Sequence, residues 1–300
     1  MILSNNKRFW AKTGIFLGLM FCLVALIGIF APLDKNSVRE IVFSINRGEG
    51  SRKIGYNLQV QGLTRSTPFL RLYVLATGVS NKLQAGDYLL SPGMSMFTMV
   101  RKFTTGDVIQ EKLTIIEGWG IEDIENYFAQ RGRIIKISPD LEGYLFPDTY
   151  HIGKDASNEE ITAMMRANFE RKFNNDFRQE TIRQGKTIAQ IVTMASLLEK
   201  EVKTLEDKKI VADVLWKRLS IGMALQVDAA PITYALPGLP LNPIANPGLE
   251  SIQAALYPTE SPYWYYLSTP EGSPGGEASR TIFSRTLGEH NIAKAKYLRN

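Results

Sequence analysis

The clearest pattern of apolar and polar positions lies between Thr187 and Val202, and it predicts an amphipathic helix. The apolar residues recur there at intervals of three and four; they are Ile188, Ile191, Val192, Ala195, Leu198 and Val202. Thr187 and Gln190 stand at the spacing of a capping box, which predicts the start of the helix. Glu199 falls inside the apolar face, because it lies four residues after Ala195.

A carboxylate on a core-facing stripe is costly unless a partner or a reaction uses it. Apolar surroundings favour the protonated carboxyl, which is the form that a general acid needs. The alternative is structural: Glu199 is buried and paired with an arginine or lysine from elsewhere in the fold. Helix geometry alone leaves both interpretations open. Glu201 points away from the stripe, and we expect it and Lys200 to be solvated or paired.

The second pattern is an uncharged, mostly apolar run over residues 13–33. A run of about 20 such residues can span a bilayer. Three basic residues precede it: Lys7, Arg8 and Lys12. The positive-inside rule therefore predicts a cytoplasmic tail at 1–12, with the bulk of the chain beyond the cytoplasmic membrane. A cleaved signal peptide is the alternative, but the run is long for one and no small-x-small site stands near Ala31.

The rest of the chain mixes strand and helix patterns without a regular βαβ rhythm, which predicts an α+β fold. A short internal repeat spans the expected boundary between two domains, and each copy reads strand, Glu-Gly, helix and glycine stop. The copies run from Ile41 to Gly62 and from Lys112 to Gly132. Chance is an alternative for so short a pattern.

Composition narrows the classes of function. Hydrophobic residues make up 44% and charged residues 22%, as in an ordinary globular protein, and the net charge is +5. Lysine and arginine are scattered, so nucleic acid is not an expected partner, whereas an anionic membrane or polymer would suit the charge. The single cysteine, Cys22, lies in the apolar run, and two histidines, His151 and His290, are too few for a typical zinc site. We therefore expect neither a disulfide nor a metal.

Five segments contain the residues suited to chemistry. They are 142–150 (EGYLFPDTY), 195–201 (ASLLEKE), 218–228 (from Arg218 to the run GMALQVD), 243–256 (PIANPG and SIQAAL) and 283–291 (FSRT and EHN). Together they resemble the endolytic murein transglycosylases, the MltG or YceG-like family. The resemblance runs from the apolar segment to the C-terminus, and five segments in the same order make it specific.

The resemblance implies a membrane-anchored lyase with a LysM-like module at 37–112 and a YceG-like catalytic domain at 113–300. Its essential acid is the first glutamate of a Ser-x-x-Glu-Lys-Glu stretch, which is Glu199 here. It implies cuts in nascent peptidoglycan between N-acetylmuramic acid and N-acetylglucosamine, so that glycan strand length is limited. Peptidoglycan synthases are implied as partners, and no cofactor is required.

Lytic cleavage requires only one carboxylate. Glu199 would protonate the bridging oxygen and then take the proton of the sugar's own 6-hydroxyl, which closes on C1 to leave a 1,6-anhydro end. A muramidase that hydrolyses the same bond needs a second carboxylate, for which Asp228 is the best candidate. A non-catalytic scaffold that binds the cell wall is the other alternative.

The expected substrate-binding residues come from the same segments: Glu142, Asp148, Tyr150, Gln226, Asp228 and Asn246. For Asp148 we favour a structural role beside Pro147. The aromatic run 263–266 offers stacking faces for sugars, although half of a strand normally faces the core. His290 either braces the site or only packs.

The chain departs from the family pattern at three places. A stretch is missing between Tyr234 and Gly238, the run 226–230 reads QVDAA, and Thr281 stands where the family has a histidine. These differences bear on substrate fit and rate more than on the type of reaction.

Overall fold

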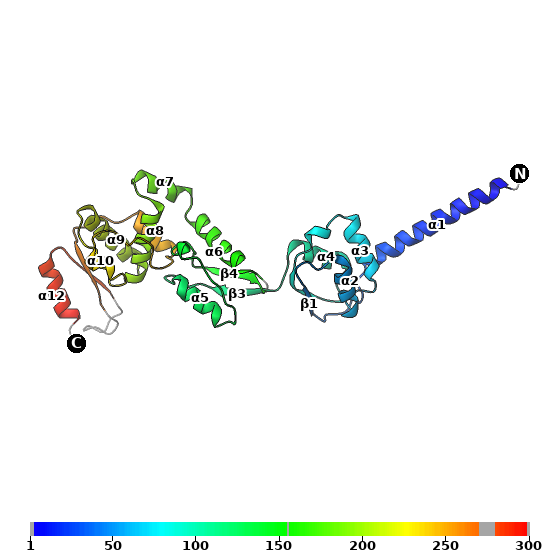
Figure 1. Cartoon of the computed structure of the whole chain (residues 1–300), viewed down its shortest axis with the longest axis horizontal. Helices are drawn as coiled ribbons and strands as arrows, with labels where there is room; N and C mark the ends of the chain where they lie inside the picture. The colour runs from blue at the N-terminus through cyan, green and yellow to red at the C-terminus, as the bar shows by residue number, and fades with distance from the viewer. Residues whose placement is uncertain (1–2, 155, 270–279, 299–300) are drawn as a thin grey trace. The chain divides into compact units, whose positions relative to one another are not determined.

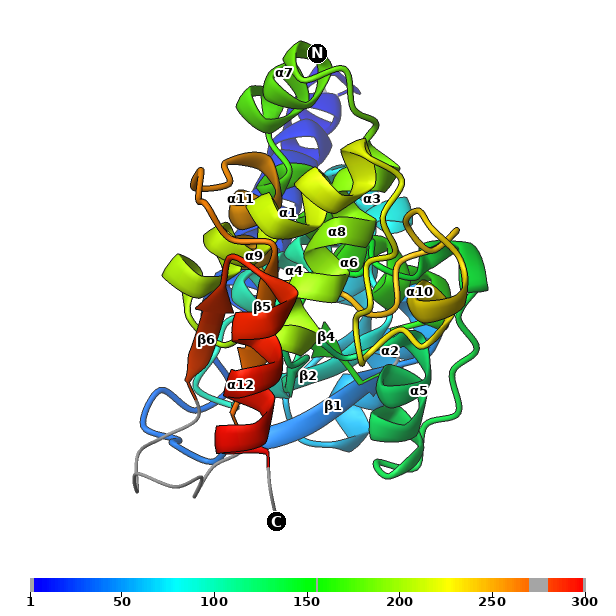
Figure 2. The ribbon, with the colours of Figure 1, turned by 90° about the vertical axis from the view of Figure 1, so that its left-hand side faces the viewer.

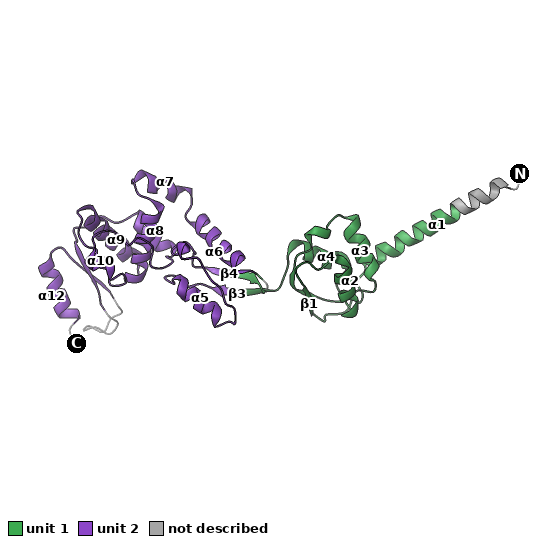
Figure 3. Ribbon diagram, viewed as in Figure 1, with its two compact units in different colours: residues 1–112, 151–156 green, residues 113–150, 157–300 purple. Residues whose placement is uncertain are grey.

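The structure is a computed structural model that describes residues 3–154, 156–269 and 280–298, with side chains from residue 12 onward. Figure 1 traces its helices and strands in chain order. Two compact units divide the chain, residues 1–112 with 151–156 and residues 113–150 with 157–300 (Figure 3). The mixture of helices with short strands confirms the α+β class.

The first unit begins with helix α1, Leu3–Phe30. Within it, Lys12–Phe30 is long and apolar enough to cross a membrane. The elements that follow are β1 (Ile41–Ile45), α2 (Ser51–Val60), α3 (Thr67–Ala76), the 3-10 turn η1 (Ser80–Lys82), β2 (Gly86–Leu90) and α4 (Met96–Thr105).

Strands β1 and β2 are antiparallel, with Phe43 opposite Tyr88 in the register. Both side chains are fully buried, and both rings contact Phe103 of α4. Alternation along β1 buries Phe43 and Ile45 on one face of the pair, as expected for a half-covered sheet. This unit therefore has a hydrophobic core of its own.

A two-stranded sheet pairs β3 (Gln110–Thr114) with β4 (Thr149–Gly153). Helix α5 (Ile121–Ala129) and the 3-10 turn η2 (Pro139–Leu141) lie between these strands in sequence. The second unit continues with α6 (Asn158–Lys172), α7 (Asn175–Arg183), α8 (Ile188–Glu201), α9 (Leu205–Ser220), α10 (Ile232–Ala235), α11 (Leu249–Leu256), β5 (Tyr265–Ser268), β6 (Thr281–Ser284) and α12 (Leu287–Tyr297).

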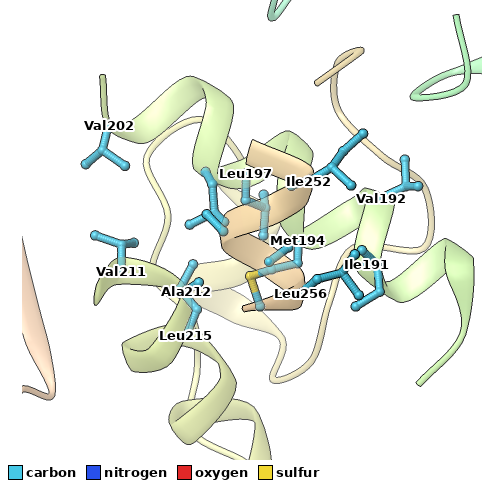
Figure 4. Packing of buried hydrophobic residues seen from close by; sticks show 14 of the residues in the cluster. Ile191, Val192, Met194, Leu197, Val202, Val211, Ala212, Leu215, Ile252 and Leu256 are labelled. Atoms are coloured by element: carbon cyan, nitrogen blue, oxygen red, sulfur yellow. The ribbon is translucent and has the colours of Figure 1, made fainter. Parts of the chain in front are cut away.

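Helix α8 is the centre of the second unit and packs against α7, α9 and α11. Figure 4 shows its side chains interleaved with those of α9 and α11. Residues 191–198 are all buried, so the predicted single apolar stripe is too narrow. The reason is that several helices cover α8 from different sides, and Thr193 and Ser196 are enclosed together with the apolar residues. At the far end of this unit, α12 packs on the β5–β6 pair (Figure 2).

Local sequence signals set the helix ends. The capping box predicted for α8 is confirmed. The backbone N–H of Gln190 donates to Thr187 Oγ1 at 3.1 Å, and the backbone N–H of Thr187 donates to Gln190 Oε1 at 2.8 Å. The glycine stops of the internal repeat are confirmed too. Gly62 and Gly132 have positive φ angles of 71° and 74°, a conformation that favours glycine.

Candidate active site around Glu199

Glu199 lies in the last turn of α8, and its carboxylate is held from two other helices. Lys208, in the first turn of α9, donates to Oε1 at 3.0 Å. The backbone N–H of Gly248 and the hydroxyl of Ser251, at the start of α11, donate to Oε2 at 2.8 and 2.7 Å. The side chain of Glu199 is 9% exposed and that of Lys208 is 3% exposed. The carboxylate is therefore almost enclosed and fixed in orientation.

These partners differ from the surroundings that helix periodicity predicted for Glu199. The sequence predicted apolar surroundings for Glu199, whereas the structure provides a buried lysine and two hydrogen-bond donors. The structural alternative, a buried glutamate paired with a lysine, thus describes the ion pair correctly. Such a pair does not exclude a reaction, because buried ion pairs and active sites use the same arrangement of groups.

One lone pair of Glu199 is left for a proton. A carboxylate has about four acceptor positions, two on each oxygen. The donors from Gly248 and Ser251 occupy Oε2, and Lys208 occupies one position of Oε1. Glu199 also lines a cavity of about 210 Å³ together with Glu201, Asp207 and Ser268. The open position of Oε1 is where a proton could be held for a reaction.

A second carboxylate, Glu117, lies beside this group. Its side chain rests on Gly248, so that a Cβ atom at position 248 would be 2.0 Å from Glu117 Oε1. Glu117 is an exposed residue whose carboxyl is only partly buried against Gly248; this partial burial, and then the charge of Glu199, raise its pKa above the usual value, while Lys208 acts in the opposite direction. Within the described residues, no hydrogen bond or ion pair reaches this carboxylate.

Of the two alternatives expected for Glu201, solvated or paired, the structure has the paired one. Its carboxylate accepts hydrogen bonds from the Ala229 N–H at 3.1 Å and from the Tyr266 hydroxyl at 3.3 Å. Burial, opposed by the Ala229 hydrogen bond and reinforced by the charge of Asp228, raises the pKa of Glu201. The residue points away from the α8 core, as predicted, but the aromatic strand β5 covers it.

Gln226 and Asp228 lie on the Glu201 side of the unit. Both line a polar cavity of about 560 Å³ with Glu201, Tyr234 and His290. Asp228 accepts a hydrogen bond from the Tyr234 hydroxyl. Gln226 has a φ of 53°, a strained conformation for a non-glycine residue, and strain of this kind is common at binding sites. The structure thus places two of the predicted substrate-binding residues at one cavity.

The aromatic run 263–266 does not follow the alternation expected of a strand, because two adjacent residues face one cavity. Tyr265 and Tyr266 line the 560 Å³ cavity, and Tyr263 stacks on Phe283 of β6. His290 stacks on Tyr265, and its Nδ1 is buried without a hydrogen-bond partner among the described residues. Burial lowers the pKa of His290. His290 therefore contributes to this cavity and not to the surroundings of Glu199.

Glu142 and Asn246 form a separate, structural cluster. Asn246 is fully buried; its side chain accepts from the Leu145 N–H at 2.9 Å and donates to the Trp119 carbonyl at 2.9 Å. Glu142 accepts from the N–H of Ile121, the first residue of α5, at 3.0 Å. Burial raises the pKa of Glu142. These contacts join the loop before α11 to the turn that follows β3.

Asp148 and Tyr150 meet at Asn168 of α6. The Asn168 amide donates to Asp148 Oδ2 at 3.0 Å and to the Tyr150 hydroxyl at 3.0 Å. The first of these bonds lowers the pKa of Asp148, and burial raises that of Tyr150 to about 12. Asp148 also accepts from the Thr149 N–H at 2.8 Å, which gives it the structural contacts of a turn residue. The six predicted substrate-binding residues therefore fall in three clusters.

Three residues around Glu199 received no role from the sequence: Glu117, Lys208 and Ser251. The Glu-Gly pair of the internal repeat did contain Glu117, and this was the one signal that pointed to it. Lys208 and Ser251 come from other helices, and no local pattern relates them to Glu199. Among the described residues, no group of three or more histidine, cysteine, aspartate or glutamate side chains could hold a metal ion.

The chain is similar to known proteins over most of its length. The chain is 28% identical to the endolytic murein transglycosylase of Bacillus subtilis over 90% of this chain and 88% of that protein. It is 24% identical to the endolytic murein transglycosylase of Streptococcus pneumoniae, over 97% of this chain and 66% of that protein. The crystal structure of a YceG-like protein from Listeria monocytogenes superposes with a TM-score of 0.54 at 27% identity, and covers 85% of this chain and 99% of that one.

The family model of the YceG-like family matches residues 43–232 and 232–296, which is most of the chain. The match begins within β1 of the first unit and includes all the residues that surround Glu199. The chain belongs to the YceG-like family.

Proposed function

We propose that this chain is an endolytic murein transglycosylase, a lyase that cuts peptidoglycan glycan between N-acetylmuramic acid and N-acetylglucosamine and leaves a 1,6-anhydro end. The names of the relatives from Bacillus subtilis and Streptococcus pneumoniae support the reaction class. The observation that carries the residue assignment is the enclosed Glu199 carboxylate, oriented by Lys208 and α11 beside a cavity.

In this proposal, Glu199 protonates the bridging oxygen while positive charge develops at C1. The muramic acid 6-hydroxyl attacks C1 and gives up its proton, so no water is consumed. In the simplest scheme Glu199 takes that proton back through the open position of Oε1. The ion pair with Lys208 keeps the side chain in one rotamer through both steps.

The substrate residues and domains are part of the same proposal. Gln226 and Asp228 bind sugar in the cavity beside Glu201, two residues after Glu199, and the strained backbone of Gln226 supports a functional position. Residues 37–112 form a LysM-like glycan-binding module, supported by its order of β1, α2, α3 and β2 with antiparallel strands. Residues 113–300 form the catalytic domain. Glu142, Asp148, Tyr150 and Asn246 support the walls of the site through their hydrogen bonds.

The apolar stretch of α1 anchors the protein as a single pass at residues 13–33, and the basic tail 1–12 stays in the cytoplasm. The catalytic domain then works outside the cytoplasmic membrane on nascent glycan, close to the peptidoglycan synthases, and limits strand length.

Product analysis on defined glycan strands tests the proposal. We expect the full chain in detergent to release fragments with anhydro ends, and Glu199→Gln to lower turnover by about 10² to 10⁴-fold. Glu206→Gln, which changes an exposed carboxylate of α9, is the matched control and should leave turnover unchanged. Near-parental cleavage by Glu199→Gln would disprove the assignment.

A muramidase is the second candidate, because Glu117 lies close to Glu199 and Asp228 is a further carboxylate in the cavity beside Glu201. Mass spectrometry separates the two reactions, since a reducing end contains one water more than an anhydro end. Binding of glycan without any change in strand length, in the parent and Glu199→Gln alike, would instead indicate a scaffold.

A further inference from the structure

We propose that Glu117 is a second catalytic carboxylate, and that it accepts the proton of the muramic acid 6-hydroxyl while Glu199 protonates the bridging oxygen. This inference rests on the proposed function. It divides between two residues the roles of acid and base that the simplest scheme gives to Glu199 alone.

Gly248 brings the two carboxylates together. Its N–H donates to Glu199 Oε2 at 2.8 Å, and its Cα faces Glu117, whose Oε1 would be 2.0 Å from a Cβ atom there. From standard bond lengths, Glu117 Oε1 is at most about 7.5 Å from Glu199 Oε2 and at most about 9.5 Å from Oε1, the oxygen with the open position. Pairs of carboxylates that share the work of glycoside cleavage are separated by about 5 to 9.5 Å. Glu117 is therefore close enough to act on the same sugar.

The next residue also contacts Glu199. A Cβ atom on Gly118, whose φ is 80°, would lie 3.4 Å from Glu199 Cγ. The Gly118 N–H donates to the Asn246 carbonyl at 2.9 Å, and the Asn246 N–H donates to the Trp119 carbonyl at 2.9 Å. These backbone bonds fix the turn that presents Glu117. The buried Asn246, expected from the sequence to bind sugar, thus helps to hold the second carboxylate in place.

The lone pairs of the two carboxylates are used differently. Glu199 accepts from three donors, which leaves one acceptor position. Glu117 accepts from none within the described residues, so its lone pairs are free for a substrate hydroxyl. The pKa of Glu117 is raised by burial and by the charge of Glu199, and a carboxylate with a raised pKa is a better base.

The step balances without a further reactant. The bond from C1 to O6 forms while the bond from C1 to the bridging oxygen breaks. Glu199 gives its proton to the bridging oxygen, and the proton of the 6-hydroxyl passes to Glu117. Before the next cut, a proton returns from Glu117 to Glu199 through solvent.

The first test is Glu117→Gln in the detergent-solubilised full chain, assayed on defined glycan strands. We expect turnover to fall by about 10²-fold or more, with sedimentation on insoluble peptidoglycan and the thermal midpoint unchanged. Glu122→Gln, an exposed carboxylate in the first turn of α5, is the matched control. Parental turnover in Glu117→Gln would overturn the inference, and if Glu199→Gln were inactive at the same time, the proposed function would stand.

Gly248→Ala provides a second test that leaves Glu117 itself unchanged. The φ of Gly248 is −73°, which alanine can adopt, and its N–H to Glu199 is retained. The new methyl group would displace only the flexible end of Glu117. Turnover should fall as in Glu117→Gln, and the double variant should be no worse than either single one. Parental turnover in Gly248→Ala would contradict the inference, and so would a double variant whose loss of turnover is the sum of the two single losses. Products with reducing ends in place of anhydro ends would contradict the 6-hydroxyl as the proton source.

Discussion

The two copies of the strand, Glu-Gly and helix pattern have the same local sequence signal but place their glutamates differently. In the first copy, Glu49 accepts from the Asn46 N–H at 2.9 Å and from the Asn57 amide at 2.8 Å. Its side chain is 2% exposed, with Lys53 at 3.8 Å. In the second copy, Glu117 has no such partner among the described residues and lies against Gly248.

The difference begins in the sequence of the second copy. Two extra residues separate its Glu-Gly pair from the helix, because Ile124 and Phe128 correspond to Ile54 and Leu58 at a later position. At the helix positions of Lys53 and Asn57, the second copy has Asp123 and Tyr127. Asp123 accepts from the Gly120 N–H at 3.0 Å at the start of α5, whereas no side-chain hydrogen bond caps α2 in the first copy.

The comparison indicates that a glutamate held by its own turn contributes to stability, whereas a glutamate with free lone pairs beside a second carboxylate is available as a base. Glu49 stabilises its own turn, because its carboxylate accepts hydrogen bonds from Asn46 and Asn57. Glu117 lacks such local hydrogen bonds among the described residues, and the fold places it close to the carboxylate of Glu199. We therefore expect substitutions in the first copy to change stability and those in the second copy to change turnover.

The largest effect on stability should come from Lys208→Met, which removes the buried cation near Glu117 and Glu199. Loss of one member of a buried ion pair leaves the other charge uncompensated and costs about 3–5 kcal/mol. Urea unfolding of the full chain measures the free energy. The double variant Lys208→Met with Glu199→Gln should recover much of the loss, and no recovery would contradict the pairing.

A smaller effect is expected for Glu49→Gln, which weakens charge-assisted hydrogen bonds inside the first copy. The free energy of unfolding should fall by about 1–2 kcal/mol, because hydrogen bonds to a buried charge are stronger than neutral ones. Turnover on defined strands should remain at the parental value, since Glu49 lies in the first unit. A Glu49→Gln variant with parental stability and impaired turnover would contradict the assignment of Glu49 to stability and Glu117 to catalysis.

The smallest effect on stability is expected at the glycines that follow the helix in each copy. Gly62→Ala and Gly132→Ala each place a side chain at a positive φ, with no neighbouring atom close enough to clash. Each should lower the free energy of unfolding by about 1–2 kcal/mol at most, from backbone strain alone. Thermal unfolding of the two variants compares them directly, and a much larger loss in one copy would show that the helix stops are not equivalent.

Several features of the site could be predicted because they depend on near neighbours in the chain. The capping box of α8 involves residues three apart, and the position of Glu199 on the α8 face follows from helical spacing. The apolar stretch of α1 is equally local. Family membership, inferred from five short segments, was confirmed by the family model.

Other features could not be predicted for the opposite reason. Lys208 and Ser251 reach Glu199 from other helices, 9 and 52 residues away. The amide of Asn246 is occupied by a residue 101 positions earlier, and Glu201 is covered by a strand 65 positions later. No periodicity within one element relates such residues, because their contacts depend on how helices and loops pack.

The sequence by itself determined the elements of this protein, the membrane-length helix and the carboxylate at the end of α8, since these depend on interactions along a few turns of chain. The tertiary structure decided which charges surround that carboxylate and which glutamate of the repeat stands beside it. The physical reason is that burial and electrostatic coupling are set by distance in space. The Glu-Gly residues are the same in both copies, yet Gly50 has a φ of −77° and Gly118 a φ of 80°, and the groups beside the second glutamate lie more than 80 residues away in sequence.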